Sequence, residues 1–347
     1  MHGSKAEQIL TNSRLHSALE LLGWSAFFAD QVEPAEADLV PRRVASVHRA
    51  RIEAMGDTGS VRLELPANAN TADFAVGDWV LADPLSDMLV RRLDRKTVFK
   101  RRPEVGRAEQ LVAANIDTLL IVTSCNADFN VERLERYLIM ANQAGSKPVI
   151  VLTKADTADD VGAFQAKAEA LQRDLPVVAL NGRSDDAGSL LSSWCGVGQT
   201  IALVGSSGVG KSTLVNTLTK TDAKQKTGTI REHDAQGRHT TTARSLHAIP
   251  GGGWVIDTPG IRTLYVSDIT DGIDTLFSDI TELAPHCRFR DCTHAHEPGC
   301  AVQAAVKSGT LAADRVERWR NLVSENRDRT PVTSGPRGNK IVRKKKY

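Results

Sequence analysis

The sequence lacks both the long hydrophobic run of a membrane protein and the leader of a secreted one. No apolar run reaches the roughly 18 residues that a membrane-spanning helix requires. The N-terminus, MHGSKAEQIL, has no apolar stretch ahead of a cleavage site. We therefore expect a cytoplasmic protein that does not bind membranes.

The chain also has almost no net charge, but its charges are unevenly distributed. The formal net charge is +2, from 44 Lys and Arg against 42 Asp and Glu. Residues 329–347 hold seven basic and no acidic residues, and residues 42–102 hold 12 basic and 8 acidic ones, so the remainder is acidic. Basic ends on an acidic body are typical of contact with a polyanion. A solvated, disordered tail is the alternative interpretation of residues 329–347.

Cysteine is scarce, with five residues in 347. Cys125 and Cys195 are isolated, and we expect both to be buried as small hydrophobic side chains. The others fall within 14 residues, together with two histidines: Cys287, Cys292, Cys300, His294 and His296. Three thiolates and one imidazole form a closed tetrahedral set for a structural Zn²⁺, and spacing alone does not choose between the histidines. Such an ion would stabilise a small domain without taking part in catalysis.

The length exceeds what one hydrophobic core usually organises, so we expect several domains. Residues 1–40 are interpreted as an N-terminal helix, over residues 13–22, followed by a linker. Residues 41–102 contain short alternating runs punctuated by glycine, which predict a small all-β barrel or sandwich. Its basic end, RRLDRKTVFKRR, includes Phe99 and suits single-stranded nucleic acid, unless the charges only protect an edge strand.

Residues 103–264 show the alternation of an α/β domain. Apolar runs that are expected to form strands alternate with helical segments. The expected strands lie at residues 117–124, 148–153, 176–180, 201–205 and 252–257. This pattern predicts a mainly parallel, doubly wound sheet. Residues 265–328, which contain the Cys/His cluster, are expected to form a small helical domain. The basic tail, residues 329–347, is expected to be disordered in isolation.

A phosphate-binding loop follows one of the apolar runs and opens a helix. The segment GSSGVGKS matches the pattern G-x-x-x-x-G-K-[ST], whose glycines let backbone N–H groups converge on phosphate oxygens. Lys211 would reach the β- and γ-phosphates, and the Ser212 hydroxyl would bind Mg²⁺. The candidate phosphate-binding residues are Gly205, Ser206, Ser207, Gly208, Val209, Gly210, Lys211, Ser212 and Thr213.

Two further elements indicate which nucleotide binds. Thr153, Lys154 and Asp156 form a T-K-x-D element, in which the carboxylate can accept hydrogen bonds from guanine N1–H and N2–H₂ but finds no such donors on adenine. Asp257 and Gly260 belong to a D-x-x-G element, in which the aspartate holds Mg²⁺ through water and the glycine senses the γ-phosphate. Together they favour GTP over ATP.

The order of these elements is unusual, because the guanine-reading element precedes the phosphate-binding loop. The domain is therefore interpreted as a circularly permuted GTPase. A switch loop is expected at GRHTTT, residues 237–242, where Thr241, or alternatively Thr242, would complete the Mg²⁺ coordination. Ile261 stands where Ras-like enzymes place a water-orienting glutamine. His239 is therefore the candidate for orienting the attacking water.

The barrel, the permuted motifs and the Cys/His segment, in this order, resemble the ribosome small-subunit-dependent GTPase A family. The resemblance covers nearly the whole chain. It implies an OB-type barrel, a circularly permuted GTPase domain and a zinc-binding C-terminal domain. It also implies GTP hydrolysis stimulated by the small ribosomal subunit during late maturation. By position, His239 matches the histidine of hydrolysis, and the matching zinc ligands are Cys287, Cys292, His294 and Cys300.

The chain departs from the family pattern at two places. Asn181 stands where a serine-containing loop usually backs the guanine, and the segment after the D-x-x-G element differs from the usual acidic-aromatic pattern. Overall, we expect a monomeric, Mg²⁺-dependent GTPase with one structural Zn²⁺. It would bind small-subunit rRNA through the barrel, the zinc domain and the tail, and would not bind DNA. The alternatives are a P-loop enzyme that uses ATP, and an RNA-binding module with a vestigial GTPase domain.

Overall fold

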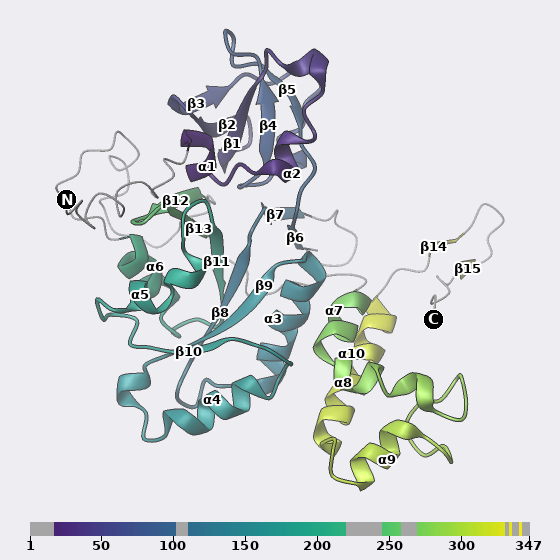
Figure 1. Cartoon of the computed structure of the whole chain (residues 1–347). Helices are drawn as coiled ribbons and strands as arrows, with labels where there is room; N and C mark the ends of the chain where they lie inside the picture. Colours follow the sequence, from purple (N-terminus) through teal and green to yellow (C-terminus); the bar gives the residue numbers. More distant parts are fainter. Residues whose placement is uncertain are drawn as a thin grey trace, which may run out of the picture.

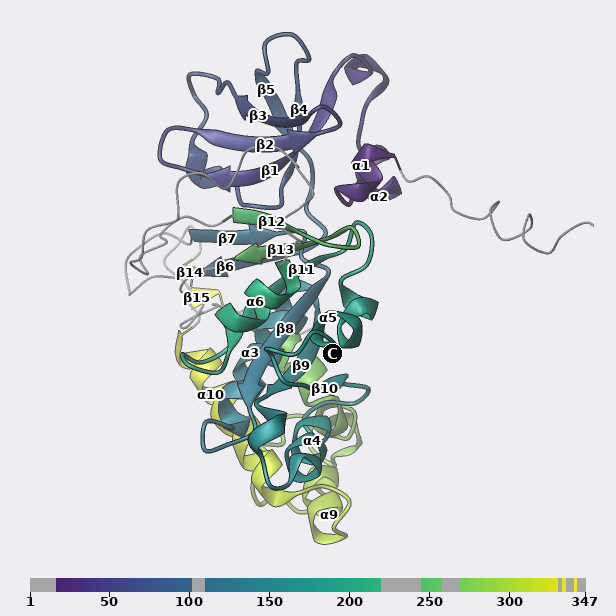
Figure 2. The ribbon, with the colours of Figure 1, turned by 90° about the vertical axis from the view of Figure 1, so that its left-hand side faces the viewer.

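The computed structural model describes residues 17–101, 110–219, 245–257, 269–329, 333–334 and 340–341. Three units follow one another along the chain: a β-barrel, an α/β unit and a helical unit (Figure 1). The barrel and helix α9 lie at opposite ends of the molecule, with the α/β sheet between them (Figure 2). Among the described residues, no helix combines the length and apolar character needed to cross a bilayer.

Two short helices, α1 (Ala18–Leu21) and α2 (Ala26–Ala29), precede the barrel and connect it to the α/β unit. Ser17 caps α1 by accepting a hydrogen bond from the Glu20 backbone N–H. The Trp254 indole, on the sheet, donates to the Leu21 carbonyl at 2.7 Å. The end of the N-terminal segment thus rests on the α/β unit.

The barrel consists of five strands: β1 (Val40–Val47), β2 (Ile52–Gly56), β3 (Gly59–Leu63), β4 (Trp79–Ala82) and β5 (Leu89–Arg92). Strand β1 pairs with both β2 and β4, β2 pairs with β3, and β4 pairs with β5. A parallel bridge between Glu64 and Met88 joins the ends of β3 and β5 and closes the ring. The expected barrel is confirmed, with the strand order of an OB-type fold. Its interior is filled by Val44, Ile52, Ala54, Leu63, Val80, Ala82 and Leu89.

The segment TVFKRR forms a strand, as expected, but not in the barrel. Strand β6 (Val98–Arg101) pairs with β7 (Gln110–Ala114) in a separate hairpin. The Phe99 ring is only 2% exposed and belongs to the core that continues into the α/β unit. The expectation that Phe99 presents its ring to nucleic acid is therefore wrong, because the ring packs inward.

Two arginines of the same basic segment are already paired with acidic side chains. Arg91 Nε lies 2.5 Å from Glu36 Oε1, and Arg95 Nε lies 2.6 Å from Asp78 Oδ1. The hydrogen bond from Arg91 lowers the pKa of the Glu36 carboxyl to about 2. The positive charge that this segment offers to a polyanion is therefore smaller than its composition indicates.

The α/β unit is built on one sheet with the order β10-β9-β8-β11-β13-β12. Its strands are β8 (Thr118–Ser124), β9 (Lys147–Thr153), β10 (Val177–Ala179), β11 (Thr200–Val204), β12 (Ser245–Ile249) and β13 (Gly253–Asp257). All are parallel to their neighbours except β12, which runs antiparallel to β13. Strand β12 also meets β1 of the barrel at Ser245 and Ser46. The predicted doubly wound sheet is confirmed and is continuous with the barrel.

Helices cover both faces of this sheet. The core of one face is shared with α3 (Val131–Ala144) and α4 (Val161–Glu169), and that of the other with α5 (Ala187–Leu190) and α6 (Lys211–Thr219). Because consecutive strand residues point to opposite faces, the continuous apolar runs supply both cores. Helix α3 begins after the N-cap Asn130, as expected.

The helical unit packs against α3. It contains α7 (Thr270–Leu276), α8 (Ser278–Thr281), α9 (Ala301–Lys307) and α10 (Ala313–Arg329). The Gly272 backbone N–H donates to Gln143 Oε1 at 2.9 Å, and a Cβ atom at Gly272 would lie 2.4 Å from the Ile139 carbonyl oxygen. Glycine therefore allows α7 to approach α3 closely.

In the tail, β14 (Thr333–Ser334) pairs with β15 (Lys340–Ile341). The rest of the tail, for which disorder is expected, lies outside the described residues.

Candidate functional site

The phosphate-binding loop lies between the end of β11 and the start of α6. Gly205, Gly208 and Gly210 have φ angles of 144°, 80° and 98°, a region that side chains strongly disfavour. A Cβ atom at Gly205 would also lie 2.1 Å from the carbonyl oxygen of Val122 on the adjacent strand. Backbone geometry thus requires glycine at these positions. The resulting strand, loop and helix have the arrangement of a phosphate-binding site.

Two cationic side chains converge on the second residue of this loop. Lys211 Nζ donates to the Gly205 carbonyl at 2.8 Å and also to the Ser206 carbonyl. Arg133, from the first turn of α3, donates through Nη1 to the Ser206 hydroxyl. A bound phosphate would compete with the two carbonyl oxygens for the lysine ammonium group.

The T-K-x-D element lies directly beside the loop, although about 50 residues separate them in sequence. Thr153 is 2% exposed, and its Oγ1 lies 2.6 Å from the Val209 carbonyl oxygen and 3.1 Å from that of Thr123. Lys154 adopts a left-handed conformation, with φ of 57°, and Asp156 is exposed in the 3-10 turn that follows. The Thr153 hydroxyl therefore ties the base-reading segment to the phosphate-binding loop.

We expect Thr153→Val to weaken the binding of GTP and GDP equally. The change keeps the shape of the side chain but removes the hydrogen bond to Val209, a loss of about 1 kcal/mol or roughly fivefold in Kd. Titration calorimetry with each nucleotide measures the effect. Thr118→Val is the matched control, because Thr118 is equally buried but on β8, away from the loop. Equal losses in both variants would contradict a specific role for the Thr153 hydroxyl.

Several predicted residues cannot be placed by the structure. Asp257 ends β13, next to β11, but its side chain is not described. His239, Thr241, Thr242, Gly260 and Ile261 lie outside the described residues. Asn181 is described, and its Oδ1 accepts a hydrogen bond from the Arg183 backbone N–H at 3.0 Å, within its own turn.

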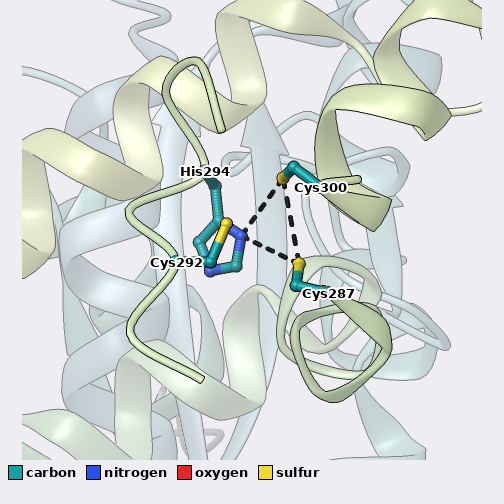
Figure 3. Close-up of side chains that lie close together, drawn as sticks. All are labelled: Cys287, Cys292, His294 and Cys300. Atoms are coloured by element: carbon teal, nitrogen blue, oxygen red, sulfur yellow. Dashed lines mark hydrogen bonds between the residues drawn. The ribbon is translucent and has the colours of Figure 1, made fainter. Parts of the chain in front are cut away.

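The four predicted metal ligands come together in the helical unit. The ligand atoms of Cys287, Cys292, His294 and Cys300 all lie within 4.8 Å of one another (Figure 3). Cys287 Sγ lies 3.8 Å from Cys300 Sγ, and His294 Nδ1 lies 3.4 and 3.5 Å from these two sulfurs. A tetrahedral ion with bonds of about 2.3 Å to sulfur and 2.0 Å to nitrogen holds such atoms roughly 3.5–3.8 Å apart. The donor set and its spacing therefore fit one metal ion.

Burial distinguishes the two candidate histidines, and neighbouring residues hold the ligand histidine in place. His294 is buried, whereas His296, the alternative ligand, is exposed and outside the cluster. Gln303 Nε2 donates to the His294 carbonyl at 2.7 Å, and the Trp319 ring packs on the imidazole, with centroids 5.5 Å apart. Glu297 organises the loop: hydrogen bonds from the Thr293 side chain and backbone hold the pKa of its carboxyl below the usual range.

Arg133 also contacts this site, although no sequence motif points to it. The sequence indicates the contact between Arg133 and the loop only indirectly. Arg133 follows β8, and β8 neighbours β11, whose carboxyl end carries the phosphate-binding loop. In a parallel sheet, helices that follow adjacent strands begin at the same edge. A basic residue in the first turn of such a helix is therefore a candidate for contact with the loop.

Comparisons with protein families and with individual proteins give the same family. Residues 92–267 match the family described as RsgA GTPase. "Small ribosomal subunit biogenesis GTPase RsgA" of Mesorhizobium japonicum is 65% identical over 92% of this chain and 93% of its own length. "Small ribosomal subunit biogenesis GTPase RsgA 2" of Vibrio parahaemolyticus is 45% identical over 88% of this chain and 85% of its own length.

Solved structures show the same fold. YjeQ from Thermotoga maritima superposes with a TM-score of 0.62 at 24% identity, covering 84% of this chain and 99% of the other. YloQ, described as a circularly permuted GTPase, superposes with a TM-score of 0.59 at 21% identity, covering 86% of this chain and 99% of its own. The barrel, the permuted α/β unit and the helical unit thus form a known arrangement.

Proposed function

Because the chain belongs to the RsgA GTPase family, we propose that it is a GTP hydrolase that binds the small ribosomal subunit and assists the late assembly of that subunit. The observation that carries the proposal is the contact between the two nucleotide motifs. Thr153 of the guanine-reading element is bonded to Val209 of the phosphate-binding loop. One nucleotide can therefore contact both motifs, with its base at one and its phosphates at the other.

The residues of the site take the following proposed roles. Lys211 binds the β- and γ-phosphates, Asp156 accepts hydrogen bonds from guanine, and His239 orients the attacking water. Ser212, Thr241 and, through water, Asp257 would hold Mg²⁺. Thr153, Lys154, Gly260 and the remaining loop residues complete the nucleotide contacts. The ion, when bound, would offset the charge that develops on the phosphates.

We propose that the Cys/His cluster holds Zn²⁺. Three thiolates and one imidazole favour zinc, and four protein ligands leave no open position for a substrate. The ion would stabilise the loop between α8 and α9, where few apolar side chains are available. Its role is structural, so nucleotide chemistry belongs to the residues proposed above and not to the helical unit.

We propose that rRNA is the part of the ribosomal subunit that this protein contacts, as a monomer in the cytoplasm. Exposed arginines lie on the barrel at Arg49, Arg51 and Arg62, of which Arg51 is paired with Glu53 at 3.6 Å. The basic tail supplies further positive charge for phosphates. Binding through such contacts falls steeply as salt rises, so the complex with the subunit should be strongly salt-dependent.

Competition between nucleotides tests the proposal against an ATP-dependent enzyme. GTP should displace a fluorescent guanine nucleotide, whereas ATP in large excess should not, because adenine lacks the donors that Asp156 accepts. Asp156→Asn should reduce this discrimination. Equal displacement by GTP and ATP would contradict a guanine-specific site. Binding of GTP without any turnover, alone or with small subunits, would instead favour an RNA-binding module with a vestigial site.

A further inference from the structure

Arg133 brings a second positive charge to the phosphate-binding loop. Its Nη1 donates to the Ser206 hydroxyl, while Lys211 Nζ donates to the carbonyl of the same residue. Both cations are therefore within hydrogen-bond reach of one residue of the loop. The G-x-x-x-x-G-K-[ST] pattern accounts for the lysine but not for the arginine.

The helix that carries Arg133 is held firmly in place. Asn130 caps α3 by accepting a hydrogen bond from the Arg133 backbone N–H at 2.8 Å. Leu134 and Leu138 are buried against the sheet. Glu135, fully buried, is bonded to Arg318 of α10 at 2.9 Å. Because the backbone of Arg133 is fixed and its guanidinium is hydrogen-bonded to Ser206, its charge is positioned before a nucleotide arrives, which is the condition for strong electrostatic effects.

The charge of Arg133 is also not neutralised by the described part of the protein. Its side-chain partner there is the neutral hydroxyl of Ser206, and no described carboxylate forms an ion pair with it. Of the other charged groups of this helix turn, Glu132 is exposed to solvent and two have partners elsewhere. Glu135 pairs with Arg318, and Arg136 pairs with Glu325 at 2.8 Å. The positive charge therefore remains available to an anion at the loop.

We propose that Arg133 is a specificity-determining residue that makes the site prefer GTP over GDP. This inference rests on the proposed function. GTP carries one more negative charge than GDP at its phosphate end, so a fixed cation near the loop attracts GTP more strongly. Even at a distance of roughly 10 Å and an effective dielectric constant of about 20, two such charges attract enough to change an equilibrium constant about fifteenfold. Partial exposure of Arg133 to solvent reduces this to an expected change of about fivefold.

The experiment measures Kd for GTP and for GDP with the full chain and its variants. Arg133→Gln keeps a hydrogen-bond donor but removes the charge, and should lower the GTP preference about fivefold. Arg133→Lys keeps the charge and should retain most of the preference. The loss in Arg133→Gln should shrink as salt is raised, because the charges are screened. Arg173→Gln, at an exposed arginine outside the site, is the matched control and should change neither Kd.

Two results would overturn the inference. Arg133→Gln could weaken GTP and GDP by the same factor, which would assign the residue a purely structural role, or it could leave both unchanged. Melting temperatures of all variants establish that each is folded. Failure of the proposed function is distinguishable, because the unaltered protein would then bind no GTP, or would bind it without turnover alone and with small subunits.

Discussion

Replacing Cys300 with serine is expected to remove the bound metal and unfold the loop between α8 and α9. Cys300 is buried, and its Sγ lies at one corner of the ligand cluster. It also caps α9 by accepting a hydrogen bond from the Gln303 backbone N–H. Zinc binding to small domains of this kind is worth about 10–16 kcal/mol at neutral pH, and most of that is folding free energy. Loss of one ligand should therefore release the ion and the structure around it.

Metal analysis and limited proteolysis measure this effect. The unaltered protein should contain one zinc per chain and resist cleavage between α8 and α9, whereas Cys300→Ser should contain little zinc and be cleaved there. Nucleotide binding should persist, because the described contacts of the phosphate-binding loop include none of the metal ligands. His296→Ala is the matched control in the same loop. Stoichiometric zinc in Cys300→Ser, or loss of zinc from His296→Ala, would contradict the assignment.

Replacing Arg318 with alanine is expected to destabilise the protein by about 3–5 kcal/mol, because it leaves a buried carboxylate without its partner. Arg318 Nε lies 2.9 and 3.1 Å from the two oxygens of Glu135, whose side chain is fully buried on α3. This ion pair joins the helical unit to the α/β unit. Denaturant unfolding of the full chain measures the loss.

The loss should depend on pH in a defined direction. Burial already raises the pKa of the Glu135 carboxyl, with the hydrogen bond from Arg318 opposing it. Without Arg318 the folded-state pKa rises further, while the unfolded value stays at about 4.3. The electrostatic penalty is therefore complete above the folded-state pKa of the variant and disappears below the unfolded value, where the carboxyl is protonated in both states.

An exposed pair between the same two units provides the control. Arg173 pairs with Glu282 at 3.1 Å, and their side chains are 61% and 58% exposed. Arg173→Ala should cost less than about 1 kcal/mol, since solvent screens such a pair. If Arg318→Ala cost no more than Arg173→Ala at neutral pH, the Glu135–Arg318 contact would not be a main attachment of the helical unit.

Much of the α/β unit could be predicted from the sequence because its signals are local. The apolar run of residues 118–124 is continuous because β8 is covered on both faces. Asn130 and Gly145 bound α3, where one caps the first turn and the other takes a left-handed conformation. The glycines of the phosphate-binding loop and the spacing of the cysteines are local signals too. Backbone geometry fixes the glycines, and the geometry of metal coordination fixes the cysteine spacing.

The contacts that sequence did not predict all depend on distant partners. An alternating strand such as β6 can pair with any compatible edge, so its pairing with β7 and the burial of Phe99 follow from the tertiary structure. Glu135 looks like a solvent-facing residue of an amphipathic helix until α10, 183 residues further on, supplies Arg318. Arg133 likewise gains its role only from the order of strands in the sheet.

The most direct test of the central claim is single-turnover GTP hydrolysis with and without purified small ribosomal subunits. We predict slow hydrolysis by the protein alone and a strong increase with subunits, reduced by salt as phosphate contacts are screened. His239→Ala should lower the stimulated rate while leaving GTP binding intact. The same rate with and without subunits, at low salt and with GTP bound, would contradict a GTPase that acts on the small ribosomal subunit.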